Sequence, residues 1–201
     1  MCSSDLSIAR DSTEVSVVTE VEPARPESPL ELNLAVALLK GEKFDLFVQK
    51  MTELGVARVI PLITARADVR IRNDDEAERK MLRWRRIALE VTKQCGRARL
   101  MDIEHPIAFD RFVERPKGVE LRLMFSERSG TSLAAAVGET GERPESVTAL
   151  IGSEGGWADE EIDQARDADW KIVTLGGRIL RAETAAIVIA ALLQHRFGDL
   201  S

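Results

Sequence analysis

The sequence predicts an α/β domain, in which a mostly parallel sheet carries helices on both faces. Short apolar runs alternate along the chain with longer segments whose apolar residues recur every three or four positions. The runs are apolar throughout, which is typical of strands buried on both faces. Strands that alternate with helices in this way favour parallel pairing.

Five apolar runs are the expected strands, at residues 32–39, 59–63, 121–125, 147–151 and 172–175. Helical spacing predicts helices at residues 44–54, 75–95, 159–168 and 183–197. Gly55 and Gly96 follow two of these segments. Each is expected to end its helix, because glycine adopts the left-handed backbone of a C-terminal cap.

Residues 1–29 are expected to form a polar arm outside this domain, which then spans residues 30–201. Prolines stand at positions 23, 26 and 29, and only Glu14–Val21 has the pattern of a strand. A single strand cannot bury both of its faces by itself. We therefore place the domain boundary near Pro29.

Composition narrows the function classes. The 201 residues carry a net charge of −6, so any contact with nucleic acid must use a local basic patch. The two cysteines and two histidines lack metal-site spacing, so no metal is expected. No apolar run is long enough to span a bilayer and no signal peptide is recognisable. We expect no membrane contact and a cytoplasmic protein with unpaired thiols.

Three strand-to-helix junctions are candidate binding loops, because the carboxyl ends of parallel strands meet at one edge of a sheet. They are residues 124–127 (MFSE), 151–157 (IGSEGGW) and 175–181 (LGGRILR). Glycine lets the backbone approach a ligand, although tight turns also need it. The dinucleotide fingerprint and the phosphate loop are both absent. Two consecutive glycine junctions favour a ligand site, whereas Glu183 or Thr184 could simply cap the last helix.

The long helix predicted at residues 75–95 carries a basic face. Arginine and lysine recur at three- and four-residue spacing at positions 79, 83, 86, 93 and 97. Such a face is either simply solvated or a contact surface for phosphates, and the sequence leaves both readings open. On another face Trp84, Ala88, Val91 and Cys95 are expected to be buried.

The last predicted helix is apolar on every side over residues 185–193. A helix of this kind is expected to be buried all round. It lies either entirely in the core or partly against a second subunit, as in a homodimer.

Four segments, taken in order, resemble the RsmE family of ribosomal RNA uridine-N3 methyltransferases, which belongs to the SPOUT superfamily. The resemblance covers residues 32–198. The segments are 50–55 (KMTELG), 93–97 (KQCGR), 151–156 (IGSEGG) and 175–185 (LGGRILRAETA). The sequence departs from the family at Ser153, Lys93 and Ala182, where the family usually has Pro, often Glu and often Thr.

The resemblance implies a fold and a function. The fold has a deep C-terminal trefoil knot, built from the three junctions, and the active site lies at a homodimer interface. The function is S-adenosylmethionine-dependent methylation of uridine N3 in 16S ribosomal RNA, naked or in the small subunit. Residues 1–29 would be the remnant of a PUA-like RNA-binding domain, so weak or absent RNA recognition is expected.

The resemblance also implies site residues. Backbone groups of the junctions would bind the cofactor, at Ile151, Gly152, Glu154, Gly155, Leu175, Gly176, Ile179, Leu180 and Thr184. Glu183 is the first candidate for the general base that takes the N3 proton, and Glu154 is the second. Arg181 and Arg97, the latter in the partner's site if the chains pair, are candidates to stabilise charge on the uracil oxygens. The expected substrate-binding residues are Gln94, Arg97, Arg86 and Lys93.

Three alternatives stay open. Another SPOUT enzyme would act on a different RNA, such as a transfer-RNA ribose or guanine. A fragment without its RNA-binding domain would bind the cofactor and be inactive. A generic nucleotide-binding domain would have no knot and would bind nucleotides instead.

Overall fold

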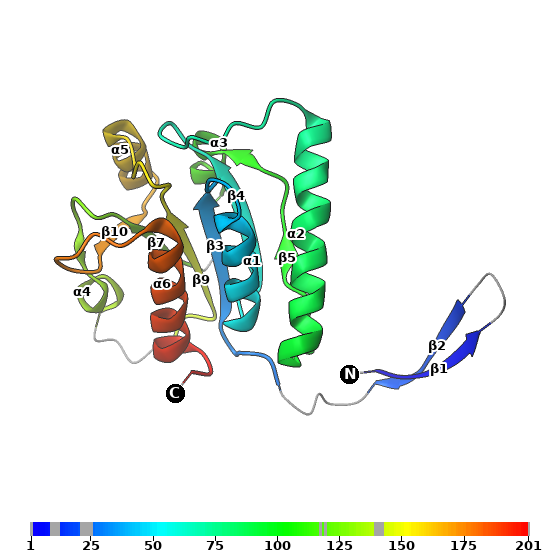
Figure 1. Ribbon diagram of the computed structural model, residues 1–201. Helices are drawn as coiled ribbons and strands as arrows, with labels where there is room; N and C mark the ends of the chain where they lie inside the picture. The colour runs from blue at the N-terminus through cyan, green and yellow to red at the C-terminus, as the bar shows by residue number, and fades with distance from the viewer. Residues whose placement is uncertain are drawn as a thin grey trace.

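Eight parallel strands form one sheet in the computed structural model of this protein (Figure 1). The structure describes residues 2–8, 13–20, 26–116, 118, 120–138 and 143–200. The strands run in the order β5-β4-β3-β9-β7-β10-β8, and β6 also pairs with β4. Their bounds are β3 Glu31–Ala37, β4 Arg58–Ile63, β5 Asp102–Ile103, β6 Ile107–Ala108, β7 Leu121–Phe125, β8 Thr131–Ser132, β9 Ser146–Ile151 and β10 Lys171–Thr174.

The central strands are buried on both faces, as their apolar sequences predict. Along β3, Leu34 and Val36 belong to one hydrophobic cluster, whereas Ala35 between them belongs to the other. In β9, Ala149 and Leu150 divide between the two clusters in the same way. This period of two follows from the pleat of a strand. The parallel sheet with two covered faces is confirmed.

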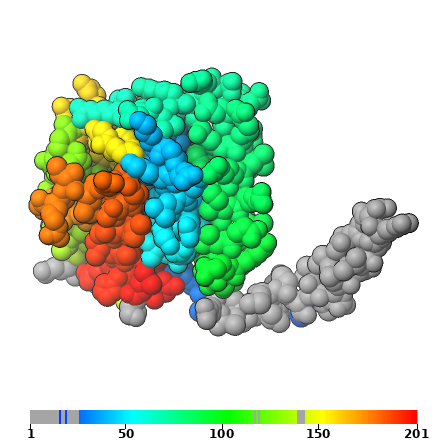
Figure 2. Space-filling model, in the orientation of Figure 1, coloured from blue at the N-terminus to red at the C-terminus, as the bar shows by residue number. Residues whose placement is uncertain are grey.

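Helices cover both faces of the sheet. On one face α1 (Lys43–Glu53) lies between α6 (Ala182–Phe197) and α2 (Asp74–Cys95), and the three pack on the larger cluster (Figures 1 and 2). On the other face α3 (Phe109–Val113) and α5 (Asp159–Asp167) pack on the smaller cluster. The short α4 (Leu133–Val137) contributes Ala136 to the larger cluster. The trefoil knot stays a prediction.

Glycine follows the ends of α1 and α2 as expected. After α1, Gly55 has φ +72°, its N–H donates to the carbonyl of Thr52, and the N–H of Val56 donates to that of Met51. These two bonds define a Schellman motif. After α2, Gly96 has φ +75° and donates to the carbonyl of Thr92.

The N-terminal region contains one strand more than predicted. The predicted strand is β2 (Thr13–Glu20), which pairs antiparallel with β1 (Cys2–Ile8) in a separate two-stranded sheet. Glu27 and Ser28 contact the large domain. Ser28 hydrogen-bonds Gln194 of α6, and Glu27 contacts the segment after α2. Residues 27 and 28 therefore pack on the large domain. The assignment of residues 1–29 to a PUA-like remnant stays a prediction.

Sequence patterns misjudge burial on two helices. In α6, Ile189, Ala190 and Leu193 are buried, but Leu192 is 39% exposed, so the helix is not buried all round in one chain. In α2, Trp84 and Ala88 are buried as predicted, whereas Val91 and Cys95 are only partly buried. The elements β5, β6, β8, α3 and α4, of two to five residues each, were not predicted. They are too short for periodicity to reveal.

Candidate functional site

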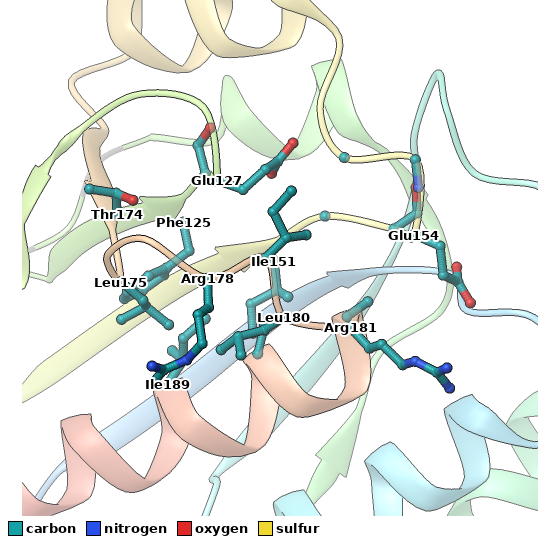
Figure 3. A pocket seen from close by; sticks show the side chains of 18 of the residues that line it. Phe125, Glu127, Ile151, Glu154, Thr174, Leu175, Arg178, Leu180, Arg181 and Ile189 are labelled. Atoms are coloured by element: carbon teal, nitrogen blue, oxygen red, sulfur yellow. The ribbon is translucent and has the colours of Figure 1, made fainter.

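A cavity of about 440 Å³ opens at the carboxyl ends of β7, β9 and β10 (Figure 3). Its walls come from the three junctions that follow these strands and from the first two turns of α6. The apolar part of the lining includes Phe125, Ile151, Leu175, Leu180 and Ile189 (Figure 3). The cavity is therefore a largely apolar pocket of the size that small ligands and cofactors occupy.

Two residues of the β9–α5 junction favour glycine, Gly155 because of a backbone contact and Gly156 because of its backbone conformation. A Cβ at Gly155 would lie 2.8 Å from the carbonyl oxygen of Arg66, and one at Gly156 would lie 2.6 Å from Oε1 of Glu127. Gly156 also has φ +66°. Gly176 differs, because its φ of +104° disfavours side chains although a Cβ there would meet nothing within 4 Å. The junction backbone thus forms the cavity wall without intervening side chains.

Trp157 fixes the β9–α5 junction against the sheet. Its indole is buried, its Nε1–H donates to the carbonyl of Phe125 at 2.8 Å, and its ring lies 5.3 Å from that of Phe109. Arg128, on the junction after β7, donates to the carbonyl of Trp157 and pairs with Asp159 at 2.8 Å. These bonds join the β7 and β9 junctions into one rigid wall.

Lys43, at the start of α1, links the β9 junction to α6. Its Nζ lies 2.7 Å from Glu154 of the β9 junction and 3.9 Å from Glu183 of α6. The hydrogen bond to Glu154 raises the pKa of Lys43 above its ordinary value. Burial favours the neutral form of Glu154, but the bond and charge of Lys43 and backbone hydrogen bonds outweigh it. They hold the pKa of Glu154 below its ordinary value.

The structure brings most of the predicted cofactor residues together. Eight of them line the cavity, namely Ile151, Gly152, Glu154, Gly155, Leu175, Gly176, Ile179 and Leu180. The predicted catalytic residue Arg181 lines it as well. Thr184 is exposed in the first turn of α6 and does not line it. Glu183 does not line it either, although its Oε2 is buried and has no hydrogen-bond partner among the described residues.

The predicted residues on α2 lie elsewhere. The helix follows β4 and runs back along the sheet, so its last turn lies at the amino ends of the strands (Figure 1). This last turn carries Lys93 and Gln94, and Arg97 follows it, so none of the three lines this chain's cavity. Arg86, two turns earlier in α2, is exposed and does not line the cavity either. Any role of these residues in catalysis would therefore require the cavity of a second chain.

Arg97 is held by structural contacts. Its Nη1 donates to the carbonyls of Thr52 at 3.1 Å and Val56 at 2.9 Å, and its Nε and Nη2 donate to Glu27. The other oxygen of Glu27 accepts from the N–H groups of Ala98 and Arg99. The Arg97 side chain is 9% exposed. These bonds tie the chain before β3 to the end of α2.

Sequence reasoning missed several lining residues, among which Glu127 is the most informative. The sequence predicts the junction after β7 as a candidate binding loop, but no pattern assigns a role to Phe125 or Glu127. Arg178 and Thr174 line the cavity as well. The signal for Glu127 was a charged residue directly after a buried strand. Its position over Gly156 depends on the pairing of β7 with β9, which local sequence does not reveal.

The bonds of Glu27 predict a pH-dependent contribution to stability. Burial opposes ionisation of Glu27, but its bonds to Arg97 and to two backbone N–H groups outweigh this, so its pKa is lowered in the folded chain. A lowered pKa stabilises the fold above the unfolded value, near 4.5, and the contribution disappears as pH falls through the folded pKa. We expect the difference in unfolding free energy between wild type and Glu27→Gln to be constant near neutral pH and to shrink below pH 4.5. Urea titrations across that range measure it, and a difference independent of pH would contradict the assignment.

The fold and the cavity define an α/β protein with a ligand site at the carboxyl edge of a parallel sheet, walled by glycine junctions. The model of the RNA methyltransferase domain matches residues 26–194. The chain therefore belongs to the RNA methyltransferase domain family, and within it to the ribosomal RNA small subunit methyltransferase E (RsmE) group.

Relatives with this description come from several bacteria. The protein of Synechocystis is 36% identical over 82% of this chain, which spans about half (53%) of that relative. The protein of Mesomycoplasma hyopneumoniae is 30% identical over 89% of this chain and 75% of its own length.

Two solved structures show the same fold. The putative methyltransferase Lpg2936 of Legionella pneumophila, in complex with S-adenosylmethionine, has a TM-score of 0.83 and 34% identity. The match covers 98% of this chain and 79% of that one. Ribosomal RNA small subunit methyltransferase E of Neisseria gonorrhoeae, also bound to S-adenosylmethionine, has a TM-score of 0.83 and 27% identity. That match covers all of this chain and 80% of the other. The predicted family and fold class are confirmed.

Proposed function

We propose that this chain binds S-adenosylmethionine in the cavity and methylates N3 of a uridine in 16S ribosomal RNA. The observation that carries the proposal is the cavity itself, which gathers eight of the nine predicted cofactor residues at one edge of the sheet. The names of the RsmE relatives support ribosomal RNA as the substrate, and two solved relatives bind S-adenosylmethionine. Such a substrate places the protein in the cytoplasm.

The residues present fit the cofactor. The apolar lining suits an adenine ring, and the open space beside Gly176 allows a ligand to approach the backbone. Glu127 places a carboxylate at the lining, which suits the positive charges of S-adenosylmethionine. When bound, the cofactor supplies an electrophilic methyl group. The protein must orient the acceptor base, exclude water and manage one proton.

Glu183 is the better of the two candidate bases. Uridine N3 carries a proton that must leave before or during transfer. Glu154 is paired with Lys43, which lowers its pKa and makes it a weaker proton acceptor. The Oε2 of Glu183 has no hydrogen-bond partner among the described residues, and Lys43 lies 3.9 Å away. In this proposal Glu183, which follows the lining residue Ala182, accepts the proton when the bound uracil reaches its carboxylate, and Arg181 binds the uracil oxygens as they become negative.

A homodimer is part of the proposal. A groove of about 310 Å³ beside α6 is lined by apolar side chains including Leu175, Leu180, Val188 and Leu192, and the neighbouring Ile179 is 85% exposed. Apolar side chains gathered in this way are typical of a subunit contact. Pairing across this face could bring α2 of one chain towards the cavity of the other. We expect a dimer in sedimentation equilibrium that Leu192→Arg dissociates, and a monomeric wild type would contradict the assignment.

Cofactor binding is the first test. Calorimetric titration with S-adenosylhomocysteine should show about one site per chain. Gly176→Val forces a branched side chain onto a φ of +104° at the cavity wall. We expect it to weaken binding by about 100-fold or more, which corresponds to roughly 3 kcal/mol. The neighbouring Gly177 has an ordinary φ and space for a Cβ, so Gly177→Ala is the matched control and should bind like wild type.

Product analysis then separates the alternatives. Small subunits from cells that lack the activity should yield 3-methyluridine after incubation with the chain and cofactor. A methylated ribose or guanine would indicate another SPOUT activity. Cofactor binding without methyl transfer would favour an inactive fragment. Binding of nucleotides in place of S-adenosylhomocysteine would overturn the methyltransferase proposal.

A further inference from the structure

The loop between β4 and α2 carries three exposed arginines, and one of them, Arg66, contacts the junction that walls the cavity. Arg66, Arg70 and Arg72 lie in residues 64–73, which join the carboxyl end of β4 to the start of α2. In Figure 2 the teal surface of this loop runs along the top edge of the domain, next to the yellow surface of the junction after β9. No pattern in the sequence distinguishes this loop from an ordinary connection.

The loop is fixed against the cofactor junction by its backbone. The hydroxyl of Ser153 donates to the carbonyl of Arg66 at 3.2 Å, and the same carbonyl packs against Gly155. The N–H of Ala65 donates to the buried carboxylate of Glu161 at 2.8 Å. Arg66 is therefore held beside the β9 junction, whose residues Ser153 and Gly155 both line the cavity.

The arginine side chains of this loop form no ion pair among the described residues, although Asp74, Asp75 and Glu76 follow at the start of α2. Arg66 and Arg72 make no side-chain hydrogen bond or ion pair among the residues that the structure describes, and Arg70 reaches only the carbonyl of Ala65 at 3.5 Å. Asp68, also exposed, is the one carboxylate among residues 64–72. Nearby, Arg128 pairs with Asp159.

Two further cations lie in the lining of the cavity. Arg178 and Arg181 line the cavity from the β10 junction, and no ion pair to a described carboxylate neutralises either of them. In a chain of net charge −6, cations without partners therefore gather at the loop beside the cavity and in the cavity wall itself. A phosphate backbone is the ligand that such a surface fits, because it offers regularly spaced negative charges.

We propose that the loop between β4 and α2 (residues 64–73) binds phosphates of the substrate RNA and so positions the target base at the cavity. The inference rests on the proposed function. It assigns a contact with the RNA backbone near the cavity to this loop, which has no distinguishing sequence pattern. The loop acts on the RNA backbone, so its effect is independent of base sequence.

The test measures RNA binding and cofactor binding separately. The full chain is titrated with a labelled single-stranded oligouridine over a series of salt concentrations. Replacing Arg66, Arg70 and Arg72 together by Gln should weaken RNA binding at least tenfold at low salt. It should also flatten the plot of log affinity against log salt by about 0.7 for each phosphate that the variant no longer neutralises. The affinity for S-adenosylhomocysteine should stay within twofold of wild type.

The matched control removes the same charge elsewhere. Arg111, Arg143 and Arg196 are exposed and have no side-chain partner among the described residues. Replacing these three by Gln should leave RNA affinity and its salt dependence near wild type. Equal losses in both triple variants would indicate a general charge effect, and an unchanged loop variant would assign the loop to another partner; either result overturns the proposal. Failure of the proposed function would appear differently, as a wild-type chain that does not bind S-adenosylhomocysteine.

Discussion

Replacing Arg181 by alanine is expected to reduce the rate of methyl transfer by about 100-fold, the usual cost of removing one group that stabilises a developing negative charge. Arg181 lines the cavity, and no described carboxylate forms an ion pair with it. Its guanidinium is therefore available to a substrate. Single-turnover rates on small subunits, with saturating cofactor, measure the effect.

The conservative variant Arg181→Lys distinguishes charge from shape. Lysine keeps the charge and loses the planar pair of donors, so we expect an intermediate rate. In both variants the affinity for S-adenosylhomocysteine should change by no more than a few-fold, because the cavity walls are intact. A turnover equal to wild type in Arg181→Ala would remove Arg181 from the mechanism.

Replacing Arg97 by alanine is expected to lower stability strongly. The change leaves Glu27 without its ionic partner and removes one donor from each of the carbonyls of Thr52 and Val56. Losing this partly buried pair together with the two hydrogen bonds costs about 3 kcal/mol. For a chain of this size that corresponds to a fall in Tm of roughly 6–12 °C. Thermal unfolding followed by circular dichroism measures it.

Arg99→Ala is the control for Arg97. Its side chain is exposed and makes no bond to the described residues, so stability should change by less than about 0.5 kcal/mol. Below the unfolding temperature, the folded Arg97→Ala enzyme should retain the turnover of wild type if Arg97 acts only through these structural contacts. A loss of turnover with unchanged folding and unchanged cofactor binding would instead support the catalytic role that the resemblance implies.

The position of Arg97 shows what a sequence motif conveys. The segment KQCGR lies within the residues that match the RNA methyltransferase domain. The motif alone does not distinguish a residue that contacts substrate from one that holds the fold. That distinction depends on Glu27, which lies seventy positions earlier and reaches Arg97 only after folding.

Sequence alone determined the elements with strong local signals. The continuous apolar runs identify strands buried on both faces, and the glycines at 55 and 96 identify helix ends, because these properties depend on neighbouring residues. The glycine junctions after β9 and β10 likewise predicted the edge of the sheet at which the cavity opens. Eight of the nine predicted cofactor residues line the cavity there.

Only the tertiary structure decided which distant groups meet. The order β4-β3-β9-β7-β10 brings Glu127 over Gly156, Lys43 between Glu154 and Glu183, and Arg66 beside the β9 junction. It also directs one side of α6 to solvent although its sequence is apolar all round. These contacts arise from strand pairing between segments far apart in the chain. Local periodicity carries no information about such pairing, because it records only which side of an element is buried and not what lies against it.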